Sequence, residues 1–158
     1  MNQLPLRPNV AMLVFNHEHK LWLGERMKER GIWQFPQGGI EPELSLEGNV
    51  LKELEEELGA PPSCFEIVRR LRSVHDYEFD RPPAYALGRW RGQSQTFYLV
   101  RFTGKDNDID INKHDLEFMG WRWCSVAEVK ELAEPKRLPG YLGPLKEFED
   151  FLKEISSS

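Results

Sequence analysis

Short apolar runs separated by turn-forming residues dominate the hydrophobic pattern of the chain. Five of these runs are rich in β-branched and aromatic residues, which is typical of strands. They cover residues 10–15, 20–26, 65–72, 96–102 and 118–124. Residues 75–95 instead mix Pro, Gly, Arg and aromatic residues, and we expect a long loop there with a functional role, because long loops in compact domains usually have one.

Three segments show helical rather than strand periodicity. The first runs from Ser45, which can cap the N-terminus, to residue 58, and Gly59 can end it in a left-handed conformation. A Ser-x-x-Glu capping box opens a second helix at residue 125, and an apolar stripe predicts a third over about 144–155. Strands and helices that each carry one apolar face predict an α+β fold.

The first helix carries an unusual set of carboxylates. When 100° is added per residue from Val50, Glu57 falls inside the apolar arc, Glu53 lies beside it and Glu56 follows on the same edge. Glu55 projects to the opposite flank, where a solvated face explains it. A carboxylate on a buried stripe must be neutralised or paired. Hard divalent cations such as Mg²⁺ are natural partners because they prefer several oxygen ligands.

Composition narrows the class of protein. The length of 158 residues indicates one globular domain. The formal net charge of -5 argues against nonspecific nucleic-acid binding. Cys64 and Cys124 are isolated, so we expect neither a zinc site nor a disulfide framework. The chain starts without a secretory signal pattern and has no apolar run of membrane-spanning length, so we expect no membrane partner and a cytoplasmic location.

The segment 38–60 resembles the Nudix box, Gly-x5-Glu-x7-Arg-Glu-U-x-Glu-Glu-x-Gly-U, where U is a bulky aliphatic residue. The positions that match are Gly38, Glu53, Leu54, Glu56, Glu57 and Gly59. The stretches "RPNVAMLVF", "WQFPQGGI", "GQSQTFYLVRF" and "EFMGWRW" are similar to the subgroup of bacterial RNA pyrophosphohydrolases and asymmetric dinucleoside tetraphosphate hydrolases. This resemblance implies a single Nudix domain over 1–158, folded as an α/β/α sandwich around a mixed sheet.

Three positions depart from the box. Leu44 stands where the family has Glu, Lys52 where it has Arg, and Ala60 where it has a bulky residue. Lysine keeps the charge but loses the planar fork that holds a carboxylate bidentately. Glu43 or Glu47 could supply the missing carboxylate. The departures leave open a second class of function, a nucleotide-binding module that has lost turnover.

The resemblance also implies a metal site and a mechanism. Mg²⁺, for which Mn²⁺ could substitute, would be held by Glu53, Glu56 and Glu57 and by a backbone carbonyl near Gly38. Glu117 matches a position where the subgroup has a further carboxylate near the metals. Metal-bound water would attack phosphorus after a general base took its proton, and either Glu117 or Glu53 could be that base.

Substrate contacts follow from the same resemblance. The residues expected near phosphate or nucleotide are Arg7, Arg26, Lys52, Gln95 and Lys136. Four aromatic residues of the long loop could stack on a base or could cover the edge of the core; they are Tyr77, Phe79, Tyr85 and Trp90. The expected substrate is 5′-triphosphorylated RNA, with dinucleoside tetraphosphate as the close alternative, and the sequence leaves the oligomeric state open.

Overall fold

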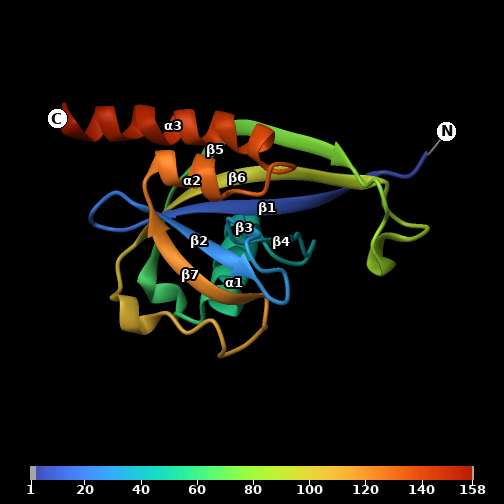
Figure 1. The fold of residues 1–158 in the computed structure, drawn as a ribbon, viewed down its shortest axis with the longest axis horizontal. Helices are drawn as coiled ribbons and strands as arrows, with labels where there is room; N and C mark the ends of the chain where they lie inside the picture. Colours follow the sequence, from blue (N-terminus) through green and yellow to red (C-terminus); the bar gives the residue numbers. More distant parts are fainter. Residues whose placement is uncertain (1–2, 158) are drawn as a thin grey trace.

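A computed structural model describes residues 3–157 as three layers (Figure 1). Helix α1 (Leu46–Leu58) covers one face of a mixed sheet, and helices α2 (Val126–Leu132) and α3 (Leu138–Ser156) cover the other. This arrangement confirms the predicted α+β sandwich. Met1 and Asn2, which belong to the segment without a secretory signal pattern, lie outside the described residues.

The sheet has seven strands in the described part of the chain. Their order is β3-β2-β1-β6-β5, while β4 pairs with β1 and β7 pairs with β2. Strands β1 and β6 run parallel and the other pairs run antiparallel, so the sheet is mixed. Their bounds are β1 Leu6–Phe15, β2 Leu21–Arg26, β3 Trp33–Gln34, β4 Gln37–Gly39, β5 Phe65–Glu78, β6 Gly92–Phe102 and β7 Phe118–Cys124.

The hydrophobic core lies on both faces of the sheet because β1 is buried on both sides. Ala11, Leu13 and Phe15 pack with residues of α2 and α3. Val10 and Met12, which point the other way, pack with residues of α1. The alternation follows from the two-residue period of a strand, and a continuous apolar run is what a central strand requires.

Helix α1 has the predicted ends and the predicted faces. The Ser45 hydroxyl accepts a hydrogen bond from the Gly48 N–H, and Gly59 ends the helix with a φ of 77°. Val50 and Leu54 are buried, and Glu57 is buried with them at 3% exposure. The helical-wheel interpretation of Glu57 is therefore confirmed.

The predicted long loop at 75–95 is wrong in its extent. Strand β5 continues to Glu78 and β6 begins at Gly92, with Tyr77 paired to Gln93 across the hairpin. The connection is therefore only 79–91. Pattern analysis missed the extension because β5 is an edge strand with two register shifts, where charged residues break the apolar alternation.

The C-terminal helix also begins earlier than predicted, at Leu138 instead of 144. Pro139 lies in the first turn, where its missing N–H removes no helical hydrogen bond. Pro144 lies inside the helix and removes only one, and Gly140 packs its backbone against His75. Proline and glycine usually favour turns, which is why the sequence predicted a helix only from about 144, although the chain is helical from Leu138.

Candidate active site

Carboxylates gather in a cavity of about 320 Å³ at the junction of β4, helix α1 and the segment before β7. Three come from α1 and two from residues 115–117, so segments far apart in sequence share one wall. The five acidic residues are Glu53, Glu56, Glu57, Asp115 and Glu117. All four predicted catalytic glutamates therefore line the same cavity, and the sequence analysis missed Asp115.

Strand β4 brings backbone atoms against these carboxylates. A Cβ atom on Gly38 would overlap the carboxylate of Glu53, so only glycine leaves this space to the acid. The backbone N–H of Gln37 donates a hydrogen bond to Oε2 of Glu57 at 3.2 Å. Pairing of Gly38 with Val10 fixes β4 to the central strand and so fixes its distance from α1.

Two of the carboxylates, Glu53 and Glu57, lie in an environment that disfavours their charged forms. Burial raises the pKa of Glu57 well above its ordinary value, and the charges of Glu53 and Glu117 raise it further. Burial, and then the charge of Glu56, raise the pKa of Glu53 to about 7. A cation placed among these groups would remove both the repulsion and part of the cost of burial.

Lys52 forms ion pairs with two glutamates instead of lining the cavity. Its Nζ lies 2.7 Å from Oε1 of Glu56 and 3.1 Å from Oε1 of Glu41, and Lys52 does not line the cavity. The lysine thus holds Glu56, which is the task expected of the family arginine. Leu44 is 38% exposed, and the carboxylate that reaches Lys52 belongs to Glu41, whereas the sequence pointed to Glu43 or Glu47.

Of the four predicted cationic contacts, two line the carboxylate cavity, whereas Lys52 and Lys136 do not. Arg7 and Arg26 belong to its wall. Arg26 is already engaged, since its Nε donates to Glu29 and its Nη1 to Gln34, both at 3.0 Å. Lys136 lies in a neighbouring cavity, largely exposed.

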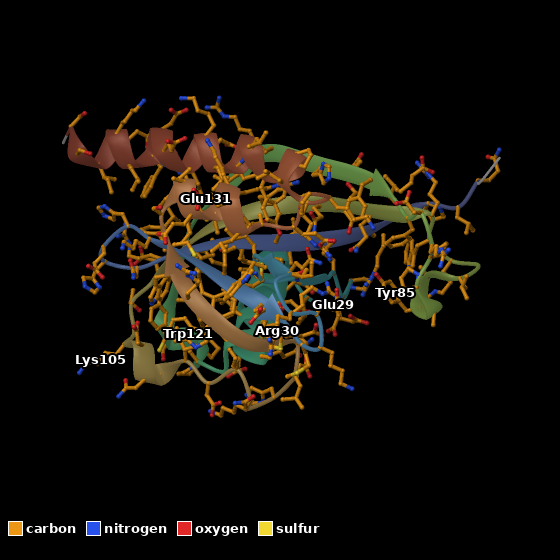
Figure 2. All side chains as sticks on the ribbon, viewed as in Figure 1. Glu29, Arg30, Tyr85, Lys105, Trp121 and Glu131 are labelled. Carbon is orange, nitrogen blue, oxygen red and sulfur yellow. The ribbon has the colours of Figure 1, made fainter. Side chains whose placement is uncertain are left out.

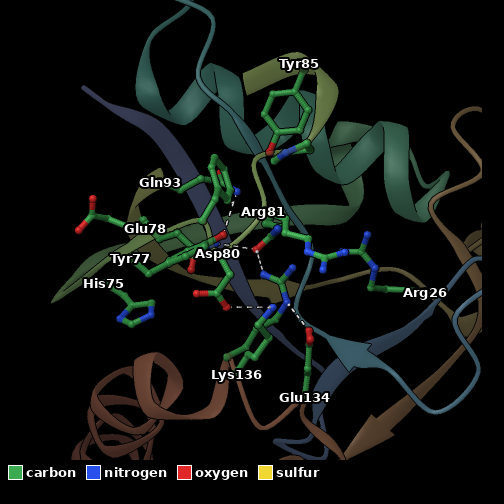
Figure 3. A pocket seen from close by; sticks show the side chains of 15 residues that line it. Arg26, His75, Tyr77, Glu78, Asp80, Arg81, Tyr85, Gln93, Glu134 and Lys136 are labelled. Atoms are coloured by element: carbon green, nitrogen blue, oxygen red, sulfur yellow. Dashed lines mark hydrogen bonds and ion pairs between the residues drawn. The ribbon is translucent and has the colours of Figure 1, made fainter. Parts of the chain in front are cut away.

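A second cavity, of about 580 Å³, is shown in Figure 3, and it adjoins the first because the two share four lining residues. Its walls are formed by β5, the 79–91 connection and the residues before α3, and they carry aromatic and cationic side chains together with the acidic Glu78, Asp80 and Glu134. Tyr77, Phe79 and Tyr85 line it, and Trp90 is absent from its lining. The residues shared by the two cavities are Arg26, Gln37, Tyr85 and Gln93. A molecule that occupied both could place a polyphosphate beside the carboxylates and an attached nucleoside beside the aromatic rings.

A polar network forms the floor between the cavities. Oε1 of Gln37 accepts from Gln95 Nε2 at 2.6 Å and from Arg137 Nη1 at 3.2 Å. Gln95 also donates to Asn9 at 3.0 Å and is only 2% exposed, so its amide is used within the protein. The network connects the second cavity to the carboxylates, because the N–H of the same Gln37 holds Glu57.

Gln93 lines both cavities, and Gln95, the predicted contact, lines the second cavity with it. Nε2 of Gln93 donates to the hydroxyl of Tyr77 at 2.8 Å (Figure 3). Its buried Oε1 has no hydrogen-bond partner among residues 3–157. The register of β6 puts both glutamines on one face, two residues apart, so the sequence alone could not choose between them.

The comparisons with known proteins agree with this arrangement. The NUDIX domain family model matches residues 5–142. The chain belongs to this family. An RNA pyrophosphohydrolase of Zymomonas mobilis is 35% identical and the match covers 100% of this chain and 99% of that protein. One of Sphingopyxis alaskensis is 33% identical over 153 residues, 93% of this chain and 95% of that protein.

Solved structures share the fold at low sequence identity. The Ap4A hydrolase of C. elegans in a binary complex superposes with a TM-score of 0.65 at 15% identity, covering 92% of this chain and 98% of that one. The dihydroneopterin triphosphate pyrophosphohydrolase of E. coli has a TM-score of 0.67 at 11% identity, covering 96% and 99%. Within the described residues, no helix is both long and apolar enough to cross a membrane.

The sequence analysis also missed Arg137, which is largely buried and directly follows the exposed Lys136 in the chain. Its Nε lies 3.0 Å from Oε2 of Glu134, and both side chains are mostly covered. The prediction of Lys136 pointed to the right segment, but only the start of α3 decides which cation turns inward. This Nudix chain therefore places Arg137, rather than Lys136, in the network that reaches Gln37.

Proposed function

We propose that this Nudix chain, acting as one domain, is a Mg²⁺-dependent pyrophosphohydrolase that removes pyrophosphate from 5′-triphosphorylated RNA. The observation that carries the proposal is the pair of adjoining cavities, one lined by five carboxylates and one by aromatic and cationic residues. Relatives named RNA pyrophosphohydrolase, at 33–35% identity over nearly the whole chain, support this substrate. The proposal includes a cytoplasmic location, where RNA is turned over.

The donor set fits a hard divalent cation. We propose that Glu53, Glu56 and Glu57, with the carbonyl of Gly38, hold the metal, because oxygen ligands are those that Mg²⁺ prefers. Among residues 3–157, no three His, Cys, Asp or Glu side chains already form a metal-ligand cluster, so the proposal rests on the shared cavity and the raised pKa values. When bound, the cation neutralises phosphate charge and makes a bound water more acidic.

The residues of the chain would divide the remaining work. Arg7 and Arg26 line the cavity with the carboxylates. Arg7 would bind phosphate oxygens, and Arg26 would add only the N–H groups that Glu29 and Gln34 leave unused. Glu117 is exposed and lines the wall of the cavity. Its backbone is held by the hydrogen bond that the Met27 N–H donates to the Glu117 carbonyl. Glu117 is the proposed general base, and Glu53, more deeply covered, is the alternative.

Product analysis tests the proposal directly. The panel consists of triphosphorylated RNA, dinucleoside tetraphosphate, nucleoside triphosphates and ADP-ribose, each with Mg²⁺, with Mn²⁺ and with EDTA. We expect pyrophosphate and a 5′-monophosphorylated RNA with either metal, and no hydrolysis in EDTA. Full activity in EDTA would refute the metal assignment.

The same panel separates the alternatives. Faster hydrolysis of dinucleoside tetraphosphate than of RNA would make it the substrate. Binding of nucleotides without any hydrolysis would favour the nucleotide-binding module. Glu117→Gln serves as an internal check, with kcat expected to fall about 100-fold and the melting temperature to hold, as for a lost general base.

A further inference from the structure

Arg7 has an unusual environment for a cation in an acidic cavity. It lies near the start of β1 and shares the cavity wall with five carboxylates. Yet within the described residues its guanidinium has neither an ion-pair nor a hydrogen-bond partner. Instead its Cζ lies 4.7 Å from the centroid of the Tyr85 ring.

The backbone of Gly39 also contacts this guanidinium. A Cβ atom at position 39 would collide with the Nη2 end of Arg7, so the absence of a side chain on Gly39 leaves room for the cation. The pairing of Asn9 with Gly39 sets this close approach of β1 and β4. Arg7 is thus held by a ring and by bare backbone.

The ring contact determines which part of the Arg7 guanidinium is used within the protein. A guanidinium that stacks on a ring uses its face, while its N–H groups point outward in the plane. Those in-plane donors form the fork that binds phosphate oxygens in pairs. A carboxylate partner would use those donors, whereas the contact with the Tyr85 ring leaves them without a hydrogen-bond partner within the described residues.

Tyr85 is brought to this point by the 79–91 connection, which folds back beside the sheet end (Figure 2). A short 3₁₀ turn, Ala84–Ala86, carries it. The Trp90 N–H donates to the carbonyl of the buried Ala86 at 2.9 Å, and the Phe79 N–H donates to the carbonyl of Arg91 at 2.9 Å, which joins the two ends of the connection. Tyr85 itself is 46% exposed and lines both cavities, so the core does not require its ring.

We propose that Tyr85 is a positioning residue of the phosphate site. It stacks on Arg7 and holds the guanidinium over the carboxylate-lined cavity, with the in-plane donors directed to the terminal phosphates of the substrate. The proposal rests on the proposed pyrophosphohydrolase function, which supplies the phosphates. The competing role for the ring is direct stacking on a nucleobase.

A probe without a base separates these two roles. Methylenediphosphonate carries two phosphonate groups on a P–C–P link that cannot be hydrolysed as an anhydride, so its binding with Mg²⁺ is measurable by calorimetry whatever the enzyme cleaves. We expect Tyr85→Leu to weaken its binding about fivefold, as for the loss of a partly exposed cation–π contact. Tyr85→Phe keeps the ring face and should bind within about twofold of wild type.

Leu87→Ala is the matched control, since Leu87 is 64% exposed on the same connection and lines neither cavity. It should bind like wild type. Because the ring of Tyr85 is also outside the core, Tyr85→Leu should melt within about 2 °C of wild type, and a larger loss would show a structural role instead.

A double-mutant cycle shows whether Tyr85 acts through Arg7. If it does, Tyr85→Leu changes binding of the probe no further in an Arg7→Gln background. Additive losses, a Tyr85→Phe variant as weak as Tyr85→Leu, or unchanged binding by Tyr85→Leu would each overturn the proposal. If wild type bound the probe but cleaved no substrate, the proposed function would fail while this cycle still decided the role of Tyr85.

Discussion

Glu57 illustrates what one residue type in one position can predict. Its charge on the apolar stripe of α1 demands a partner, and the structure provides one N–H, from Gln37, at 3.2 Å. A single backbone donor does not restore the solvation that a carboxylate loses on burial, and the raised pKa of Glu57 reflects this. The residue is therefore suited to a role that involves either a proton or a metal ion.

Glu57→Gln should separate these effects. Without metal, the neutral amide relieves repulsion from Glu53 and can keep the contact with Gln37, so the melting temperature in EDTA should equal or exceed that of wild type. With Mg²⁺ the variant should gain less stability, since a lost ligand weakens stabilisation by mass action. Turnover should fall by orders of magnitude. Glu55→Gln, on the opposite flank, is the control and should match wild type in all three.

A marked fall of the melting temperature in EDTA, with metal-dependent activity intact, would contradict this account. It would mean that Glu57 is paired with a protein cation, because breaking a buried pair strands the remaining charge.

Glu53 makes the stability of the metal-free protein depend on pH. Its folded-state pKa of about 7 exceeds the ordinary value of 4.5, so between these values the folded state binds more protons than the unfolded state. The free energy of unfolding should therefore fall as pH rises from about 4.5 through about 7. We expect melting temperatures in EDTA to decline over this range, and to decline less in Glu53→Gln. Equal slopes for the variant and wild type would exclude Glu53 as a source.

Among the elements, α1 was predictable from local sequence and the β5–β6 hairpin was not. Helix caps and the 3.6-residue period lie within the helix itself, so Ser45 and Gly59 mark its ends without any knowledge of the sheet. The last residues of β5 are extended because Tyr77 pairs with Gln93 on another strand. Such pairing depends on residues distant in sequence, which pattern analysis cannot supply.

The preceding turn and α1 also explain how the departures from the Nudix box are accommodated. Glu41, in the turn before α1, pairs with Lys52 at 3.1 Å, whereas Leu44 carries no charge. The buried Asn49 fixes this turn, accepting from the Glu41 N–H at 2.7 Å and donating to the carbonyl of Ser45 at 2.9 Å. A local turn thus supplies the charge in place of the expected residue.

Restoring the family residues should therefore bring no gain. Leu44→Glu combined with Lys52→Arg should give a kcat within about twofold of wild type, because exposed ion pairs of this kind contribute little. Glu41→Gln alone should likewise leave kcat within about twofold of wild type, because Lys52 still pairs with Glu56. A severalfold rise of turnover in the double variant would instead show that Leu44 and Lys52 mark partial loss of activity.

Across the whole molecule, the candidate site depends on contacts between segments far apart in sequence. The resemblance identified Glu53, Glu56, Glu57 and Glu117, but Asp115, Gln93 and Arg137 emerge only when the sheet register and the start of α3 are known. Periodicity gives the face on which a residue lies. It does not give the neighbour across that face, which is why the polar network was not predicted.

One such contact joins the end of α1 to the segment that carries Asp115 and Glu117. The N–H of Asp110 donates to the carbonyl of Leu58 at 2.7 Å, and a Cβ atom on Gly59 would overlap the carbonyl oxygen of Asp110. Gly59 is therefore required twice, once for its φ of 77° and once for this approach. The helix end and the 106–117 segment can hold their relative position only while residue 59 lacks a side chain.

Gly59→Ala should consequently destabilise the fold more than its backbone conformation alone explains. Gly88 is the matched control, since its φ of 73° is similar and a Cβ there meets nothing within 4 Å. Gly88→Ala should cost about 1 kcal/mol of unfolding free energy, the usual price of a left-handed non-glycine residue. Gly59→Ala should cost about 1–3 kcal/mol more, as in overpacked sites, because backbone must move. Urea denaturation measures both, and equal losses would show that the Asp110 contact yields freely. If it does not yield, Gly59→Ala should also lower kcat under conditions where the variant remains folded, because the shift displaces Glu117 from the carboxylates of α1.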